Sequence, residues 1–222
     1  MVKSIILAAG KGTRMKSDMP KVLHTIFEKT LLGYVIDAVN NTGIADENFV
    51  IVGHQAERVE EYINKNYDNA KCVLQSPQLG TGHAVSMAVP YLKDFEGEVV
   101  ILNGDLPLIT SDTIKEFIEY HRSKKSDVTV MSAVFDDPTC YGRIIRNSDG
   151  TLNSIVEEKD TNPEQKLVKE INVGCYCLNW SKVKDAFGEL KTDNAQGEYY
   201  LTDIVKWANN NKLSVNAYII KD

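Results

Sequence analysis

Short, continuously apolar runs alternate along the first half of the chain with segments whose apolar residues recur every three or four positions. The runs have the length and β-branched composition of buried strands, and the periodic segments have the spacing of one helix face. Strands are predicted at 4–7, 49–52, 72–74 and 99–102, with helices at 31–39, 56–65 and 80–91 between them. Because strands that alternate with helices form parallel sheets covered on both faces, this half is predicted to consist of βαβ units.

The second half continues this alternation and then departs from it. The helix that follows Thr110 has Ser111 and Asp112 as candidate N-caps. Further on, two short segments flank an Asp149-Gly150 pair, which is typical of a hairpin turn. Strands are predicted at 128–134, 143–146, 152–157, 173–178 and 213–220, and helices at 182–190 and 200–210. No linker divides the chain, so one α/β domain is predicted, with a mainly parallel, mixed central sheet flanked by helices.

The composition excludes several classes of protein. The 222 residues are 43% hydrophobic, which is enough for one substantial core. A net charge of −6 argues against a nucleic-acid-binding protein, whose affinity rests on a basic face. The chain start lacks the features of a secretory signal, no run approaches the ~18 apolar residues of a membrane span, and the four cysteines match neither a zinc site nor a disulfide framework. We therefore expect a soluble, cytoplasmic protein with free thiols that does not bind membranes.

A loop with two glycines follows the first predicted strand directly. Gly10 and Gly12 stand where open parallel sheets bind ligands, beyond the carboxyl ends of the strands. Small residues there let backbone N–H groups approach phosphate oxygens closely. The spacing is neither that of a P-loop nor that of a dinucleotide fingerprint, because Met15 occupies the position of the third glycine. Taken alone, the loop is explained equally well as a tight structural turn.

Cations gather around this loop in a chain that is otherwise acidic, namely Lys11, Arg14, Lys16 and Lys21. Phosphoryl-type transfer needs positive charge where the phosphates gain negative charge. A solvated charge run explains Lys16 well and Arg14 poorly. The cations therefore favour a phosphate-binding loop.

Two further segments follow predicted strands at the same edge of the sheet. A carboxylate at Asp105 suits a Mg²⁺ that keeps most of its waters and shares phosphate oxygens, although an aspartate in a turn before a proline is also common. The amides of Gln75 and Gln78, in the segment QSPQLGTGHA, have the donors and acceptors to pair with a pyrimidine edge. We interpret His83 as a structural residue at a helix start, because attack by an ionised phosphate requires no general base.

Several blocks occur in a fixed order over nearly the whole chain: LAAGKGTRMKSDMPKVLH, QSPQLGTGHA, NGDLPLI, YGRIIR, IVEEKD, EINVG and NAQGEYYLTDI. They resemble the uridylyltransferase domain of bacterial N-acetylglucosamine-1-phosphate uridylyltransferases of the bifunctional GlmU type. The first and third blocks resemble many sugar-phosphate nucleotidyltransferases, whereas QLGTGHA, EEKD and NAQGEYYLTDI narrow the resemblance to this type. The resemblance implies a Rossmann-like nucleotidyltransferase fold and Mg²⁺-dependent transfer of UMP from UTP to N-acetylglucosamine 1-phosphate. The products would be UDP-N-acetylglucosamine, a precursor of peptidoglycan and lipopolysaccharide, and pyrophosphate.

The resemblance also implies roles for the matching residues. Arg14 and Lys21 would stabilise the phosphates in the transition state, and Asp105 would bind Mg²⁺. Residues that would hold the uridine and its phosphates are Leu7, Ala8, Ala9, Gly10, Gln75, Gln78, Gly80 and Thr81. Residues that would line the sugar pocket are Gly142, Glu157, Asn172, Tyr200 and Thr202. Asn103, where some relatives carry an aromatic residue, would contact ribose or sugar. A core position for Tyr200 and a solvated position for Glu157 are the structural alternatives.

The resemblance divides the chain into a nucleotide-binding core, 1–110, and a sugar-binding elaboration, 111–222. The chain ends before an asparagine that is the second metal ligand of the family, and before a β-helix that carries acetyltransferase activity and forms trimers. We therefore expect a truncated, monomeric chain with weak Mg²⁺ binding and low turnover. A nucleotidyltransferase for another sugar or base is the nearest alternative. A non-catalytic nucleotide-sugar sensor is a second, which the presence of both Arg14 and Lys21 disfavours.

Overall fold

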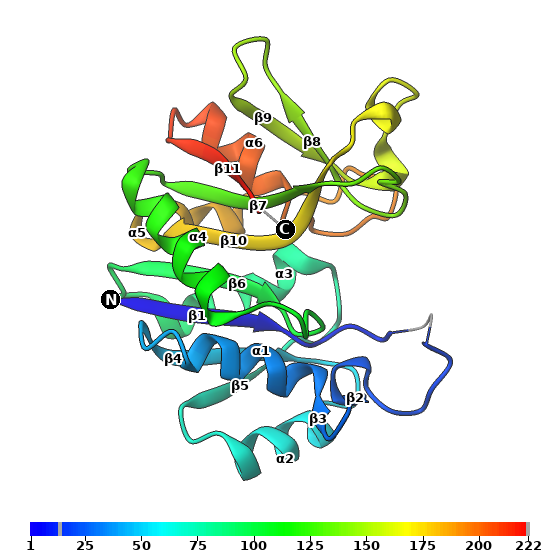
Figure 1. Cartoon of the computed structure of the whole chain (residues 1–222), viewed down its shortest axis with the longest axis vertical. Coiled ribbons are helices and arrows are strands. Elements are labelled where there is room, and N and C mark those ends of the chain that lie inside the picture. Colours follow the sequence, from blue (N-terminus) through cyan, green and yellow to red (C-terminus); the bar gives the residue numbers. More distant parts are fainter. Residues whose placement is uncertain (13–14, 221–222) are drawn as a thin grey trace.

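A nine-stranded sheet forms the centre of the computed structural model, which describes residues 1–12 and 15–220 (Figure 1). The strands are β1 Val2–Leu7, β4 Ala45–Val52, β5 Ala70–Leu74, β6 Glu98–Asn103, β7 Val128–Val134, β8 Arg143–Arg146, β9 Leu152–Val156, β10 Glu170–Asn179 and β11 Val215–Ile219. Along the sheet the order is β11-β7-β10-β6-β1-β4-β5, and β8 and β9 branch from β10. A separate two-stranded ribbon joins β2 Thr25–Ile26 to β3 Lys29–Thr30.

The strands that the first half contributes to the central sheet are parallel, as the alternation of apolar runs and helical segments predicts. Strand β1 pairs with β4 on one side and β6 on the other, and β4 pairs with β5. In this register Leu7 lies between Ile51 and Asn103. The carboxyl ends of these strands therefore meet at one edge of the sheet, where the loops that follow them come together.

Strand β10 makes the sheet mixed. It runs antiparallel to β6 and to β7, and it also pairs with β8 at Ile171, opposite Arg143. Strands β8 and β9 form the expected hairpin around Asp149 and Gly150. The final strand, β11, is parallel to β7. The expectation of a mainly parallel, mixed sheet is thus confirmed.

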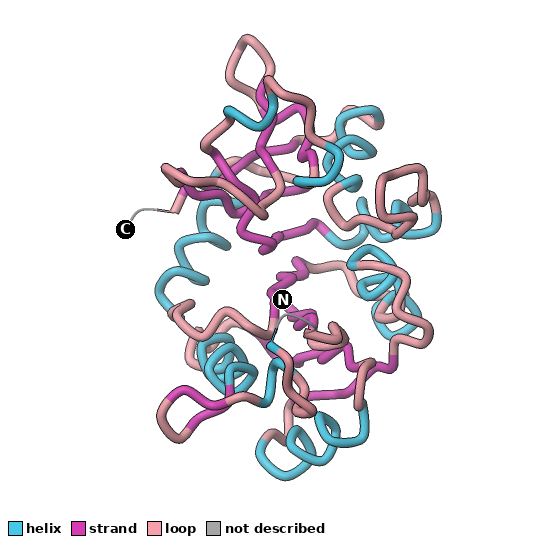
Figure 2. Tube along the Cα trace, turned by 90° about the vertical axis from the view of Figure 1, so that its right-hand side faces the viewer, coloured by secondary structure: helices cyan, strands magenta, loops and turns pink. Residues whose placement is uncertain are grey.

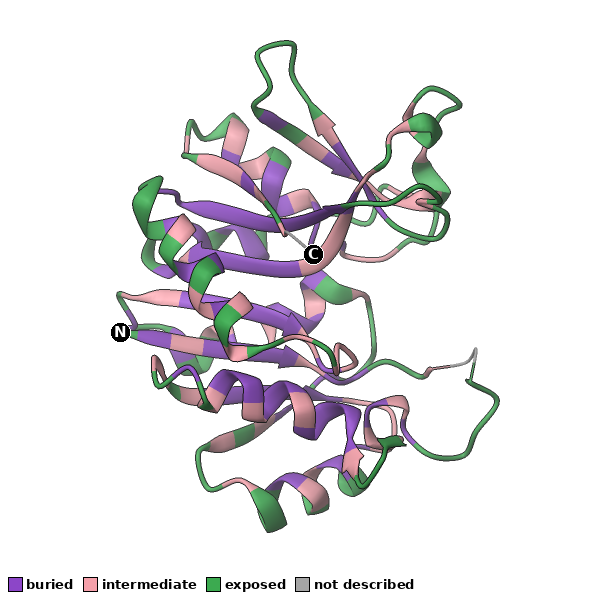
Figure 3. Ribbon diagram, in the orientation of Figure 1, coloured by how far each residue is buried: buried purple, intermediate pink, exposed green. Residues whose placement is uncertain are grey.

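Helices cover both faces of the sheet, as the view turned by 90° shows (Figure 2). One face is covered by α1 Leu31–Asn40, α2 Ala56–Asn66 and α4 Ser111–Ser123, and the other by α3 Thr81–Ser86, α5 Trp180–Val183 and α6 Asp203–Asn210. Successive residues of β6 alternate between the two apolar layers, with Ile101 in one and Leu102 in the other. Buried residues accordingly fill the strands and the inner faces of the helices (Figure 3). No helix in the described part of the chain is long and apolar enough to cross a membrane.

Some element boundaries differ from the sequence predictions for identifiable reasons. The helix expected at 80–91 is interrupted, because α3 ends at Ser86 and a 3-10 helix, η3 Val89–Leu92, follows. Pro90 lies in its first turn and lacks the N–H group that would continue an α-helix. Helix α4 is capped by Thr110, whose hydroxyl accepts from the Thr113 N–H, rather than by Ser111 or Asp112.

Two boundaries in the second half also differ. The helix expected at 182–190 is a single α-turn, α5, followed by the 3-10 helix η6 Lys184–Gly188. Helix α6 begins at Asp203 rather than at residue 200, and the backbone N–H of Leu201 is bonded to the hydroxyl of Thr81 instead. This bond ties the segment before α6 to the start of α3.

Candidate active site

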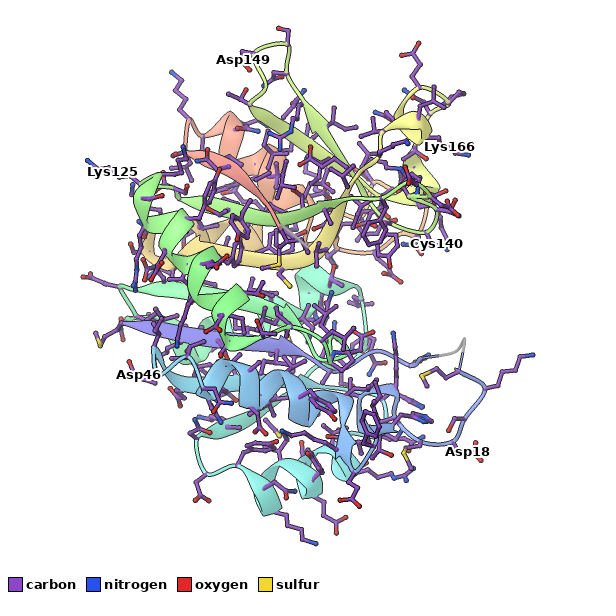
Figure 4. All side chains as sticks on the ribbon, in the orientation of Figure 1. Asp18, Asp46, Lys125, Cys140, Asp149 and Lys166 are labelled. Atoms are coloured by element: carbon purple, nitrogen blue, oxygen red, sulfur yellow. The ribbon has the colours of Figure 1, made fainter. Side chains whose placement is uncertain are left out.

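A cavity of about 700 Å³ opens at the edge of the sheet where β1, β5 and β6 end. Its described lining consists of Leu7, Ala8, Ala9, Gly10, Lys11, Gly12, Met15, Lys21, Val22, Gln75, Gln78, Gly80, Thr81, Ala84, Asn103, Asp105 and Glu198. Asp18 and Cys140 project from this same side of the molecule, one from each half (Figure 4). The cavity thus collects most of the residues to which the resemblance assigns uridine, phosphate and metal contacts.

The loop after β1 is fixed by backbone hydrogen bonds to both neighbouring strands. The Ala8 N–H donates to Ile51 O at 2.8 Å, and the Gly104 N–H donates to Leu7 O at 2.9 Å. Gly12 has φ +58°, and a Cβ on it would lie 2.7 Å from the Cβ of Lys21. Both the left-handed backbone and this close approach require glycine, so Gly12 lets the Lys21 stem pack directly against the loop.

Lys21 and Asp105 reach the cavity from different elements and form an ion pair. Lys21 begins the 3-10 helix η2 Lys21–Leu23, directly after Pro20. Asp105 stands in the turn after β6. Both side chains are about one-third exposed, at 37% and 28%, so each remains accessible to a ligand. Arg14, the second cation expected here, lies outside the described residues.

The described residues offer few metal ligands. No group of three or more His, Cys, Asp or Glu side chains among them is arranged to hold a metal ion. The carboxylates of Asp105 and Glu198 line the cavity, and carboxylate oxygens are the hard ligands that Mg²⁺ prefers. This donor set fits a cation that keeps most of its waters and shares the oxygens of a bound phosphate.

The opposite wall of the cavity is built by the segment between β5 and α3. Gln75 is 3% exposed, and its Nε2 donates to Gly80 O at 2.9 Å and lies 3.1 Å from His83 Nδ1. Gly80 has φ +109°, and a Cβ on it would lie 2.6 Å from Tyr199 O. Glycine is therefore required where the chain passes beneath the 198–201 segment.

The 198–201 segment is fastened to this wall by three further hydrogen bonds. The Tyr199 N–H donates to Leu79 O at 2.8 Å, and the Gly82 N–H donates to Tyr199 O at 2.8 Å. The Leu201 N–H donates to Thr81 Oγ1 at 3.1 Å. These bonds bring Glu198 to the cavity from the far end of the sequence.

The five residues expected at the sugar pocket lie outside the described lining of this cavity, in a neighbouring cluster. The Asn172 N–H donates to Gly142 O at 2.9 Å, and Asn172 Nδ2 donates to the Tyr176 hydroxyl at 3.0 Å. Thr202 Oγ1 donates to Glu157 Oε1 at 3.2 Å. Since Leu201 bonds to Thr81 of the cavity wall, the cluster adjoins the cavity.

The hydroxyl and carboxyl groups of this cluster are partly buried and paired. Burial raises the pKa of the Glu157 carboxyl above its usual value, and the hydrogen bond from Thr202 opposes that shift. Tyr200 is 6% exposed, as in the alternative that places it in the core, but its hydroxyl donates to Asp160 Oδ2 at 3.1 Å and accepts from Gln196 Nε2 at 3.0 Å. Glu157 is half-buried rather than a solvated strand residue.

Sequence reasoning assigned no role to several residues that line the cavity. Val22 and Ala84 form apolar parts of the cavity wall. Each directly follows a residue that the sequence analysis discussed, Lys21 or His83, and this adjacency is the sequence feature that could have indicated them. Glu198 lies within the NAQGEYYLTDI block, so that block was its signal. The hydrogen bond between Gln75 and His83 was also missed, because it depends on the turn at Gly80 rather than on a spacing visible in the sequence.

Comparison with known proteins agrees with this architecture. The family model described as nucleotidyl transferase matches residues 3–222. The solved structure of a UDP-glucose pyrophosphorylase complexed with UDP-glucose superposes with a TM-score of 0.77 at 19% identity, covering 100% of this chain and 91% of that one. HddC from Yersinia pseudotuberculosis, complexed with GMP-PN, gives a TM-score of 0.72 at 23% identity, covering 100% and 91%. At these identities the two structures bear on the fold alone.

Proteins found by sequence comparison have much higher identity to this chain than these two structures. The bifunctional protein GlmU of Caldanaerobacter subterraneus subsp. tengcongensis is 52% identical over 91% of this chain and 43% of its own length. The bifunctional protein GlmU of Streptococcus suis is 48% identical over 99% of this chain and 47% of its own length. The chain thus spans less than half the length of these relatives. It belongs to the nucleotidyl transferase family, and its resemblance to proteins of the GlmU type is confirmed.

Proposed function

We propose that this chain transfers UMP from UTP to N-acetylglucosamine 1-phosphate, giving UDP-N-acetylglucosamine and pyrophosphate in the cytoplasm. The observation that carries the proposal is the convergence of three elements on one cavity: the glycine loop after β1, the Lys21–Asp105 pair and the amide-bearing wall at Gln75. The high identity to proteins named bifunctional protein GlmU supports this choice among the reactions of the family.

The chemistry proposed is an in-line displacement at phosphorus. An ionised phosphate oxygen of the sugar 1-phosphate attacks the α-phosphorus of UTP, and the bond to the bridging oxygen of pyrophosphate breaks. The attacking group carries no proton, so no general base takes part. Lys21, and Arg14 as inferred from the sequence, would stabilise the negative charge that gathers on the α-phosphate and the pyrophosphate. The glycine loop would hold the triphosphate in line.

A divalent cation, which we propose to be Mg²⁺, fits beside Asp105. When bound, it would supply additional positive charge beside the phosphates. Asp105 would hold it with a single carboxylate, which agrees with the small number of hard ligands among the described residues. Lys21 would then exchange its contact with Asp105 for one with phosphate.

The two walls of the site suggest how the two substrates are placed. The uracil would lie against Gln75, Gly80 and Thr81, and the triphosphate would run toward Lys21 past the backbone of residues 8–10. The sugar would occupy the adjoining cluster of Gly142, Glu157, Asn172, Tyr200 and Thr202, near Asn103. Glu157 and Asn172 offer the acceptors and donors that sugar hydroxyl and N-acetyl groups require.

A substrate panel tests the proposal. The purified chain is incubated with UTP, CTP, GTP, ATP or dTTP and with N-acetylglucosamine, glucose or galactose 1-phosphate, in the presence of Mg²⁺, and pyrophosphate release is measured. We expect the fastest release with UTP and N-acetylglucosamine 1-phosphate, with UDP-N-acetylglucosamine identified by mass. A faster reaction with another sugar or base would reassign the substrate. Binding of a nucleotide sugar without turnover, even at high enzyme and Mg²⁺ concentrations, would indicate a sensor instead.

A further inference from the structure

The side-chain amide of Gln75 is held in one orientation by two partners. Its Nε2 lies 2.9 Å from Gly80 O and 3.1 Å from His83 Nδ1. A backbone carbonyl can only accept a hydrogen bond, so the amide group facing Gly80 must be the NH₂ end. The hydrogen bond to Gly80 O therefore decides which end of this amide is nitrogen and which is oxygen.

This orientation dictates the protonation state of His83. The second hydrogen of the Gln75 NH₂ group points at Nδ1, which must accept it and so cannot carry a proton. The imidazole is then neutral with its hydrogen on Nε2. Burial lowers the pKa of His83 below its usual value, in agreement with a neutral ring at neutral pH.

The other end of the amide is left for a ligand. Gln75 lines the cavity, and no described residue donates a hydrogen bond to its Oε1. Oε1 is not among the buried side-chain atoms of the described residues that lack a partner, so it is open to the cavity and can accept a hydrogen bond from a ligand that brings a donor. Uracil carries an N–H group at N3, whereas cytosine carries an unprotonated ring nitrogen at that position, which would face Oε1 with a lone pair.

We infer that His83 is a positioning residue for base selection: it locks the Gln75 amide so that an acceptor faces the base, and thereby favours uracil over cytosine. The inference rests on the proposed function, because it deepens the account of how that site reads its nucleotide. His83 does not line the cavity and acts only through Gln75. Thymine has the same N3–H group, so His83 does not distinguish it from uracil.

Two variants separate this role from a purely structural one. His83→Asn places an amide oxygen close to the position of Nδ1 and retains an acceptor for Gln75. His83→Leu keeps bulk and removes the acceptor, which leaves Gly80 O alone to orient the amide. We expect the ratio of UTP to CTP affinity to stay near the wild-type value in His83→Asn and to fall by roughly tenfold in His83→Leu.

Binding of UTP and of CTP is measured by calorimetry on wild type and both variants, with dTTP as a third probe. The ratio is internally controlled, because partial misfolding lowers the binding of all three nucleotides together. The ratio of UTP to dTTP affinity should not change in either variant. An unchanged ratio of UTP to CTP affinity in His83→Leu would overturn the inference, as would an equal loss in both variants.

The ring nitrogens of His83 provide a readout that needs no nucleotide. In protein labelled with ¹⁵N, we expect the Nδ1 chemical shift of an unprotonated nitrogen at neutral pH and that of a protonated nitrogen at Nε2. A protonated Nδ1 would overturn the inference, whatever the binding data show. If wild type binds neither UTP nor CTP, the proposed function fails, and the Nδ1 signal still decides whether His83 orients Gln75.

Discussion

The ammonium group of Lys21 contacts the carboxylate of Asp105 in the lining of the cavity. The two residues come from different elements, a 3-10 helix after the glycine loop and the turn after β6. Their charges compensate each other, so a phosphate that recruits Lys21 leaves Asp105 free for a cation. Phosphate and metal are therefore expected to bind more tightly together than separately.

Lys21 is expected to be essential for catalysis and dispensable for folding. Lys21→Ala should lower kcat by about 10²-fold or more, because it removes a cation aimed at the transferring phosphates. Its partly exposed ion pair should contribute only about 0–1 kcal/mol to stability. The measurements are steady-state pyrophosphate release and urea unfolding, with Lys65→Ala, an exposed lysine on α2, as the control. Near-normal turnover in Lys21→Ala would contradict the assignment.

Asp105 should control the metal requirement. Asp105→Asn keeps the size of the side chain and removes its charge, so the half-saturating concentration of Mg²⁺ or Mn²⁺ should rise by about tenfold or more. Binding of Mn²⁺ can be followed directly by electron paramagnetic resonance, with and without UTP. Asp46→Asn, on the exposed part of β4, is the matched control. Unaltered Mn²⁺ binding in Asp105→Asn would place the cation elsewhere.

The cluster around Glu157 should affect the sugar substrate alone. Thr202→Val removes the hydroxyl that donates to Glu157 Oε1, and Glu157→Gln removes the carboxylate. Each variant should raise the KM for N-acetylglucosamine 1-phosphate by about tenfold and leave the KM for UTP nearly unchanged, because neither residue lines the cavity proposed to hold uridine. Glu164→Gln, which is exposed, serves as control. A matching rise in the KM for UTP would argue against a sugar pocket here.

The two tryptophans provide a matched test of core stability. Trp180 is fully buried, stacks on Phe187 with ring centroids 5.7 Å apart, and donates from Nε1 to Leu92 O at 2.9 Å. Trp180→Phe should therefore lower the free energy of unfolding by about 2–4 kcal/mol, through lost packing and the loss of this hydrogen bond. The buried Nε1 of Trp207 has no partner among the described residues, so Trp207→Phe should cost less. Urea unfolding compares them, and equal losses would refute the hydrogen-bond argument.

Stability should fall as the solution is acidified through the range in which histidine titrates. His121 is buried, its Nδ1 lies 2.8 Å from Thr129 Oγ1, and burial is the largest cause of a pKa lowered from its usual 6.5. Glu98 and Asp127 raise the pKa and Arg122 lowers it further. Because the unfolded state binds the proton first, this contribution is present above the unfolded pKa and is lost as the pH falls toward the lower folded value.

The measurement is the urea midpoint from about pH 7.5 to about pH 5 for wild type and His121→Asn. Other titrating groups contribute to both proteins, so the difference between the two curves reports on His121. The wild-type midpoint should fall more steeply with acidification than that of His121→Asn. The corresponding extra loss in the free energy of unfolding is up to about 1.4 kcal/mol per pH unit. Parallel curves would show that the burial of His121 is not linked to its protonation.

Local sequence patterns predicted the elements and the edge at which the site lies. Strands β1 and β6 are buried on both faces, so each appears in the sequence as a continuous apolar run. The end of each run marks the end of the strand, and this places Gly10 and Asp105 at the same edge of the sheet. The direction of β10 does not follow, because a run such as that around Cys175 is equally apolar in a parallel or antiparallel strand. Its antiparallel pairing with β6 and β7 depends on contacts between residues far apart in the sequence.

The same distinction applies to the site. Asp105 was expected at the same edge of the sheet as the glycine loop, and Lys21 follows that loop closely in the sequence, so both were expected at one site. Glu198 reaches the cavity only through hydrogen bonds between the 198–201 segment and the start of α3, which no spacing in the sequence reveals. The partnership of Gln75 and His83 likewise requires the φ of +109° at Gly80, which brings two side chains of adjacent elements together.

Strand β10 shares hydrogen bonds with β6 of the first half of the chain and with β7 of the second half. Backbone hydrogen bonds therefore join the two halves into one sheet. The halves cannot be exchanged between related proteins as independent modules. A chimera designed to change the sugar would have to keep β10 with both of its neighbours and exchange only surface segments, such as the loop that contains Cys140.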